Sequence, residues 1–92
     1  MKVDHKATLR NNMTFLQSNI SVSRSILLDR LLECGVLDEQ EVDEIRSKNT
    51  ERDKVRELLD VLFRTSDVQY QHFLEALNAA DHEHVYDKLK GI

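Results

Sequence analysis

The stretch ERDKVRELLDVL, residues 51–62, contains the clearest helical pattern in the chain. Its apolar side chains recur every three or four positions, which is the spacing of one face of an α-helix. They are Val55, Leu58, Leu59 and Leu62. Thr50, directly before the stretch, and Asp53, three residues later, have the spacing of a helix N-cap and its backbone partner. We therefore expect an amphipathic helix that buries this apolar stripe in the core.

Three more helices are expected on the amino-terminal side. The first covers about the first twenty residues. The second carries a leucine stripe and ends where Gly35 supplies a left-handed stop. Its alternative N-caps are Ser21, Ser23 and Ser25. A short third helix begins where Asp38 and Glu41 have the spacing of a capping box.

Two helices are expected after residue 62. Ser66 and Gln69 again have capping-box spacing, and the helix that they begin runs to about Ala79 or Ala80. Asp81 is expected to cap a last helix, which Gly91 ends. With short connections throughout, the sequence predicts an all-α fold, an antiparallel bundle of six helices.

Composition favours the same class. The chain of 92 residues has no proline and only two glycines, too few for the turns of a multi-stranded sheet. We expect a single interaction domain, residues 1–92, that forms one module of a longer protein. The lone cysteine cannot form an internal disulfide and no secretory signal is evident, which favours the cytoplasm. Apolar stretches are too broken by charge for a membrane span, and the net charge of −4 argues against a nucleic-acid partner.

We expect no catalytic, metal or cofactor site, and hence no enzyme. Two isolated glycines cannot form a phosphate-binding loop, and no Cys-x-x-Cys pair exists for zinc. Cys34 is interpreted as a packed or partly exposed thiol because most of the histidines lie far from it in the sequence. His82, Glu83 and His84 are expected to form an exposed cap, since adjacent helix positions point in different directions and cannot converge on a metal.

Charge is unevenly distributed along the chain. Residues 25–44 are strongly acidic overall, whereas residues 1–24 and 45–64 carry a net positive charge. The acidic candidates for a protein interface are Asp29, Glu33, Glu41 and Asp43. The basic candidates are Lys6 and Arg10 on the first helix and Arg52 and Arg56 on the fourth. The two basic pairs would merge into one patch if those helices pack together.

These charges also have simpler explanations. Carboxylates at the start of a helix are stabilised by the helix dipole. Arg56 lies four residues before Asp60, which is the spacing of an ordinary surface ion pair on a helix. If the patches are functional, oppositely charged surfaces on one domain would let copies bind head to tail. Such a contact does not close on itself and produces a homo-oligomer or a filament.

Three segments carry a resemblance to a known family. They are residues 51–62, SILLDRLLECGVLDEQEVDEI at residues 25–45 and QYQHFLEAL at residues 69–77. In order and spacing they are similar to helices of the caspase recruitment domain, a family of the death-fold superfamily. The resemblance covers essentially the whole chain and implies a Greek-key-like bundle of six helices. It also implies a bend in the first helix, for which the weak helix formers Asn11 and Asn12 are the expected place. The death, death-effector and pyrin domains share that plan.

The resemblance also implies a binding mode. One domain docks the acidic surface of its second and third helices onto the basic surface of the first and fourth helices of another. Asp29 and Glu41 match the acidic positions, and Arg52 and Arg56 match the basic ones, with Arg10 as a further member. The sequence departs from the family at position 34, where some members have a carboxylate and this chain has cysteine.

We therefore expect a homotypic interaction module that binds another caspase recruitment domain. It would recruit a caspase, kinase or scaffold into an apoptotic or innate-immune signalling assembly. The alternative is a helical accessory or regulatory domain that packs within its parent protein and makes no homotypic contact. A small nucleic-acid-binding domain is a third interpretation, which the acidic balance disfavours.

Overall fold

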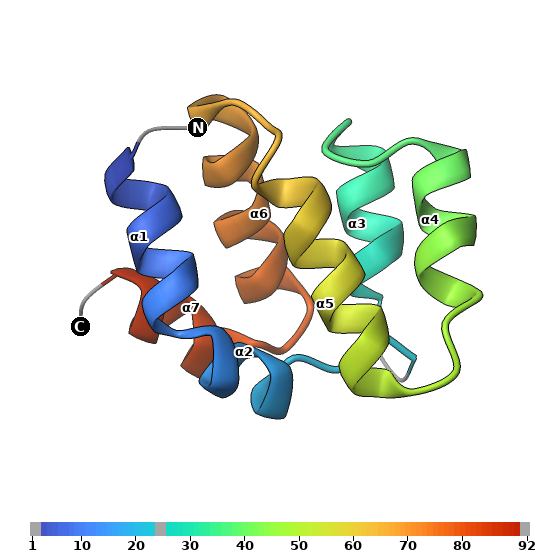
Figure 1. Cartoon of the computed structure of the whole chain (residues 1–92). Helices are drawn as coiled ribbons and strands as arrows, with labels where there is room; N and C mark the ends of the chain where they lie inside the picture. The colour runs from blue at the N-terminus through green and yellow to red at the C-terminus, as the bar shows by residue number, and fades with distance from the viewer. Residues whose placement is uncertain (1–2, 24–25, 91–92) are drawn as a thin grey trace.

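The computed structural model describes residues 3–23 and 26–90, and all regular structure within them is α-helical. The predicted all-α class is therefore confirmed. The helices of this described part are α1 Val3–Asn11, α2 Met13–Asn19, α3 Leu27–Glu33, α4 Glu39–Arg46, α5 Glu51–Leu62, α6 Asp67–Ala79 and α7 Glu83–Lys90 (Figure 1).

The helix count differs from the prediction because the first predicted helix is two helices. The break falls at Asn12, as the weak helix formers there indicated. The Asn12 N–H bonds to the carbonyl of Leu9 at 3.2 Å, one residue tighter than an α-helical turn. Its side-chain amide also donates to the Thr8 carbonyl at 2.8 Å. Such local bonds compete with the helical ladder, and α2 starts in a new direction at Met13.

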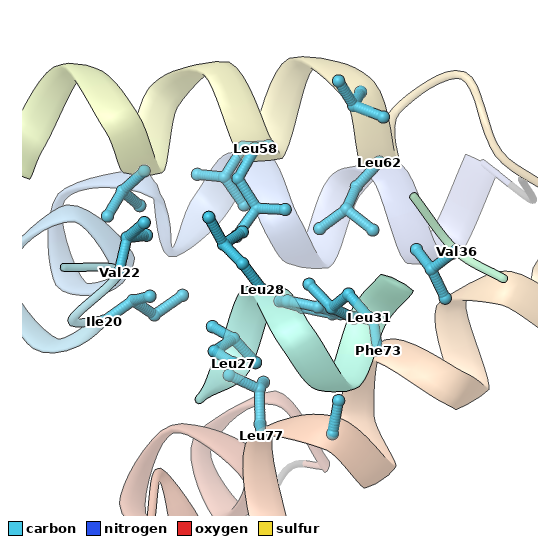
Figure 2. Packing of buried hydrophobic residues seen from close by; sticks show 14 of the residues in the cluster. Ile20, Val22, Leu27, Leu28, Leu31, Val36, Leu58, Leu62, Phe73 and Leu77 are labelled. Atoms are coloured by element: carbon cyan, nitrogen blue, oxygen red, sulfur yellow. The ribbon is translucent and has the colours of Figure 1, made fainter. Parts of the chain in front are cut away.

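Helix α3 contributes three buried leucines to the hydrophobic core. Figure 2 shows its Leu28 and Leu31 side chains below Leu58 and Leu62 of α5, with Leu27 towards Leu77 of α6. All six are buried, and the remaining residues of the predicted α5 stripe, Val55 and Leu59, are fully buried with them. The apolar period of residues 51–62 is thus confirmed as the core-facing side of α5.

Helix α5 packs against α2 on one side and α4 on the other, and α6 packs against α3 and α7 (Figure 1). Because α3 also contacts α4, these two helices lie together on one side of the bundle. Figure 1 shows α1 on the opposite side. The arrangement separates the acidic segment of the chain from its amino-terminal helix.

Three predicted helix starts are confirmed. Asp38 and Glu41 form a complete capping box, with the Glu41 N–H 2.7 Å from Asp38 Oδ1 and the Asp38 N–H 3.0 Å from Glu41 Oε1. The Thr50 and Ser66 side chains each accept a backbone N–H three residues later. These bonds satisfy N–H groups that have no partner within the helix.

The predicted start of α3 is wrong for Ser21 and Ser23. The N-cap is Ile26, which makes no side-chain capping bond. The Ser21 backbone N–H instead bonds to His82, in the connection between α6 and α7, and the Ser23 N–H bonds to Glu51 in the first turn of α5. These bonds hold both residues in the loop after α2. The third alternative, Ser25, lies outside the described residues.

Two left-handed residues end helices. Gly35 has φ 80° after α3, and the Val36 N–H returns to the Leu31 carbonyl at 3.0 Å, which confirms the predicted stop. Asp81 has φ 62°, and the following N–H returns to the Leu77 carbonyl at 2.8 Å. Asp81 therefore ends α6, and the prediction that it caps the last helix is wrong. Gly91, the predicted end of that helix, lies outside the described residues.

Candidate functional site

The four acidic candidates lie on two neighbouring helices. Asp29 is in the first turn of α3 and Glu33 is its last residue, while Glu41 and Asp43 lie on α4. Asp29, Glu33 and Asp43 are exposed and Glu41 is half-buried. We call these four residues the acidic surface. Its position on α3 and α4 is on the far side of the bundle from α1 (Figure 1).

The members of the acidic surface differ in their internal partners. Asp29 Oδ1 lies 3.0 Å from Nη2 of Arg46, and Glu33 Oε2 lies 3.9 Å from Nη1 of Arg30. Glu41 is committed to the capping box of α4. Within residues 3–23 and 26–90, Asp43 has neither an ion pair nor a side-chain hydrogen bond. Only some carboxylates of the acidic surface are therefore without an internal partner among the described residues and open to a binding partner.

Arg52 and Arg56 are exposed on successive turns of α5. The Arg52 Nε–H donates to Oε1 of Gln17 on α2 at 3.0 Å, so a neutral acceptor orients the guanidinium without cancelling its charge. Arg56 forms no ion pair with Asp60 in the described part of the chain, although both line a shallow hollow with Lys48, Asp53 and Glu57. We call Arg52 and Arg56 the basic surface.

Lys6 and Arg10 lie on α1, with Lys6 half-buried and Arg10 exposed. The packing expected between the first helix and α5 is made by α2, the other half of the predicted first helix. Lys6 and Arg10 on α1 are thus separated from Arg52 on α5 by α2. Neither side chain is ion-paired to another described residue.

Glu51 forms a clamp beside Arg52 that the sequence reasoning missed. Its Oε1 accepts the backbone N–H of Val22 and, at 2.9 Å, that of Ser23, while Lys54 Nζ donates to the Ser23 hydroxyl at 2.6 Å. Burial alone would raise the pKa of Glu51, but these N–H groups, the Ser23 side chain and the nearby Lys54 charge lower it below its usual range. The clamp fixes the loop after α2 against the first turn of α5.

His82 forms a second clamp on the same loop. Its Nε2 accepts the Ser21 N–H at 3.0 Å, and its Nδ1 lies 2.8 Å from the Ala80 carbonyl. Since a carbonyl only accepts, Nδ1 carries the proton and the ring is the neutral tautomer. Burial lowers the pKa of His82, an effect opposed by the Ala80 bond and reinforced by His84.

The expectation of an exposed histidine cap is therefore wrong for His82, which is only 4% exposed. It holds for Glu83 and His84, which are both exposed. Burial became favourable for the imidazole because both ring nitrogens find backbone partners, and one partner is 61 residues away in sequence.

No group of three or more His, Cys, Asp or Glu side chains in the described part of the chain is arranged to hold a metal ion. Cys34 is exposed at the end of α3. Among the described residues, no helix has the length and apolar character needed to cross a bilayer.

Comparison with known proteins assigns the arrangement to a family. A family model described as the caspase recruitment domain matches residues 6–91, almost the whole chain. Domains of this family are protein-interaction modules that bind other caspase recruitment or death-fold domains, and they are not enzymes. The family therefore confirms the prediction of a homotypic interaction module and the prediction that the domain is not an enzyme. A search of curated proteins finds no match. On the extent of the family match, the chain belongs to the caspase recruitment domain family.

Proposed function

We propose that this domain recruits a caspase, a kinase or a scaffold protein into an apoptotic or innate-immune signalling assembly in the cytoplasm, as one module of a longer protein. Its family membership supplies the homotypic mode of binding. The proposal adds the effector class, the pathway and the two surfaces through which copies or partners meet. Clustering of the attached effector domains would supply the signal, because tethering raises their effective concentration.

One observation carries the proposal. Carboxylates gather on α3 and α4, whereas the two exposed arginines of the basic surface lie on α5, where Arg52 packs towards α2. Complementary charges of this kind direct encounter and suppress wrong partners. Because the acidic and basic surfaces occupy different elements, one domain can use both at once, and a head-to-tail contact between copies extends into an oligomer or filament.

The test is the association of charge-reversal variants. Arg52→Glu and Asp29→Lys should each weaken self-association or binding to a partner domain, and an equimolar mixture of the two should restore one interface. Light scattering and sedimentation measure the association, and thermal unfolding shows whether each variant stays folded. Added salt should weaken the wild-type contact, because exposed charges are screened.

Matched controls separate local from general charge effects. Arg64 follows α5 and Glu75 lies on α6, and both side chains are exposed and outside the two surfaces. Arg64→Glu and Glu75→Lys change the net charge by the same amounts and should leave association near the wild-type value. Equal behaviour of all four variants would refute the proposed surfaces.

An accessory domain that makes no homotypic contact is the competing function. It predicts a monomer at every concentration and salt, equally for the wild type and all variants, and no binding to other caspase recruitment domains.

A further inference from the structure

Asp29 and Arg46 form an ion pair across the exposed side of α3 and α4. Arg46 Nη2 lies 3.0 Å from Asp29 Oδ1, in hydrogen-bonding contact. Asp29 is in the first turn of α3 and Arg46 is in the last turn of α4, so each charge also suits the dipole of its own helix. The pair therefore places the Arg46 cation within the acidic surface, which the cations of a partner domain would approach.

The exposure of this pair sets its strength. The Asp29 and Arg46 side chains are 57% and 54% exposed, so solvent screens their attraction and a partner can replace it. Arg46 also lines a hollow of about 250 Å³ with Val22, Ser23 and Lys54, which leaves room for its side chain to move aside. The bond is thus a displaceable competitor and not a fixed structural link.

Within the described part of the chain, no carboxylate is ion-paired with the basic surface. Arg52 donates Nε–H to the neutral Gln17, and neither Arg52 nor Arg56 has an ion-paired carboxylate among the described residues. An incoming carboxylate meets the Arg52 guanidinium, which Gln17 orients and with which no described carboxylate forms an ion pair. An incoming arginine at Asp29 must first displace Arg46.

We infer that Arg46 acts as an internal competitor for Asp29, so that the domain binds more readily through Arg52 and Arg56 to a partner domain presenting carboxylates than through Asp29 to another copy's basic surface. The inference rests on the proposed function and adds that the basic surface binds a partner more readily than the acidic surface does. Self-association is restrained until the partner's cation displaces Arg46.

A mixture of two variants isolates one interface for the test. Arg52→Glu retains the acidic surface, and Asp29→Lys retains the basic surface, so together they form a single contact that cannot extend. Adding Arg46→Gln to the Arg52→Glu chain should lower the dissociation constant about two- to fivefold, the range expected for a surface ion pair. Adding Arg46→Gln to the Asp29→Lys chain should leave it unchanged. Isothermal titration calorimetry measures both.

Lys48→Gln is the matched control. It removes one positive charge two residues from Arg46, but Lys48 Nζ pairs at 3.6 Å with Glu57 of α5 and not with the acidic surface. In the Arg52→Glu chain it should change the dissociation constant by less than Arg46→Gln does. Equal effects of the two substitutions, or weaker binding with Arg46→Gln, would overturn the inference.

Failure of the inference differs from failure of the proposed function. If the two charge-reversal variants bind each other and Arg46→Gln leaves their affinity unchanged, only the competitor role of Arg46 is refuted. If they do not bind with or without Arg46→Gln, the proposed surfaces and the inference are refuted together.

Discussion

Glu51 and Ser23 are joined by a hydrogen bond of 2.9 Å from the Ser23 backbone N–H to the Glu51 carboxylate, across 28 residues of sequence. The same carboxylate also accepts the Val22 N–H. Through these bonds the first turn of α5, which carries Arg52, is held against the loop that follows α2. The Glu51 side chain therefore contributes both to the stability of the loop and to the position of the basic surface.

Replacement of Glu51 by alanine should destabilise the domain by about 1–3 kcal/mol, because two backbone N–H groups lose a charged acceptor in a half-buried site. Urea unfolding at pH 7 measures the loss. Glu57→Ala is the control, since it removes only the ion pair with Lys48, worth less than about 1 kcal/mol at a surface. Equal losses for the two variants would show that the clamp adds nothing to an ordinary surface contact.

The Glu51 clamp should also respond to acid. The pKa of Glu51 is lower in the folded protein than the ordinary pKa of a glutamate. Its stabilisation is therefore complete above the pKa of the unfolded chain and is lost as the pH falls through the lower folded value. Glu51→Gln should show a shallower loss of stability than the wild type in urea unfolding between pH 5 and pH 3, values chosen to bracket the ordinary pKa of a glutamate, about 4.3.

His82 should make the domain less stable in mild acid. Its pKa is lowered in the folded state, and the neutral ring supplies the acceptor for the Ser21 N–H, so protonation opposes folding. The stabilisation is present above the unfolded-state pKa of about 6.5 and is lost as the pH falls towards the folded value. Asp81 and His84 are the charged neighbours that act on it, with opposite signs.

The check is His82→Gln, which keeps a side-chain acceptor that does not titrate. Its stability should change less than that of the wild type between pH 7.5 and pH 5.5, values chosen around the ordinary histidine pKa of about 6.5. His84→Gln removes an exposed neighbour and should retain most of the wild-type response. A wild-type response in His82→Gln would assign the pH dependence to another group.

Gly35 tests the left-handed stop of α3. A Cβ at this position would meet no atom within 4 Å, so a substitution is opposed by the backbone φ of 80° and not by neighbours. Gly35→Ala should cost about 1–2 kcal/mol of stability, measured by urea unfolding. Gly35→Asn should cost less, because asparagine tolerates this region. Equal losses of stability for the two variants would mean that the added side chain, and not the backbone conformation, causes the destabilisation.

The sequence predicted well those features that depend on neighbouring residues. The apolar period of residues 51–62, the capping box of Asp38 and Glu41 and the break at Asn12 each arise from contacts within one or two helical turns. Such contacts are encoded in spacing alone. The core face of α5 could therefore be assigned before the fold was known.

The sequence could not predict how segments that are distant in the chain meet in the fold. His82 reads as part of a polar run, and only the approach of Ser21 and the carbonyl of Ala80 makes its burial favourable. Glu51 reads as an ordinary first-turn acid, and Asp29 gives no sign that Arg46, 17 residues later, will meet it. These pairings depend on the packing of whole helices, so no local pattern records them.

Gln17 should position Arg52 for binding. Its Oε1 accepts the Arg52 Nε–H at 3.0 Å and so limits the rotation of a long side chain that must otherwise be ordered when a partner binds. Ordering such a side chain costs about 0.5–1.5 kcal/mol, so Gln17→Leu should weaken docking on the basic surface about two- to tenfold. Because the net charge does not change, the salt dependence of binding should stay as in the wild type.

The single-interface mixture of Arg52→Glu with Asp29→Lys makes this prediction specific to one chain. Gln17→Leu should weaken binding when it is placed in the Asp29→Lys chain, which supplies Arg52, and should have no effect in the Arg52→Glu chain. Gln17→Glu in the Asp29→Lys chain should weaken binding further, because a carboxylate at that position competes with the partner for the guanidinium. If Gln17→Leu leaves affinity unchanged in both chains, Arg52 acts through its charge alone and its orientation by α2 has no part in binding.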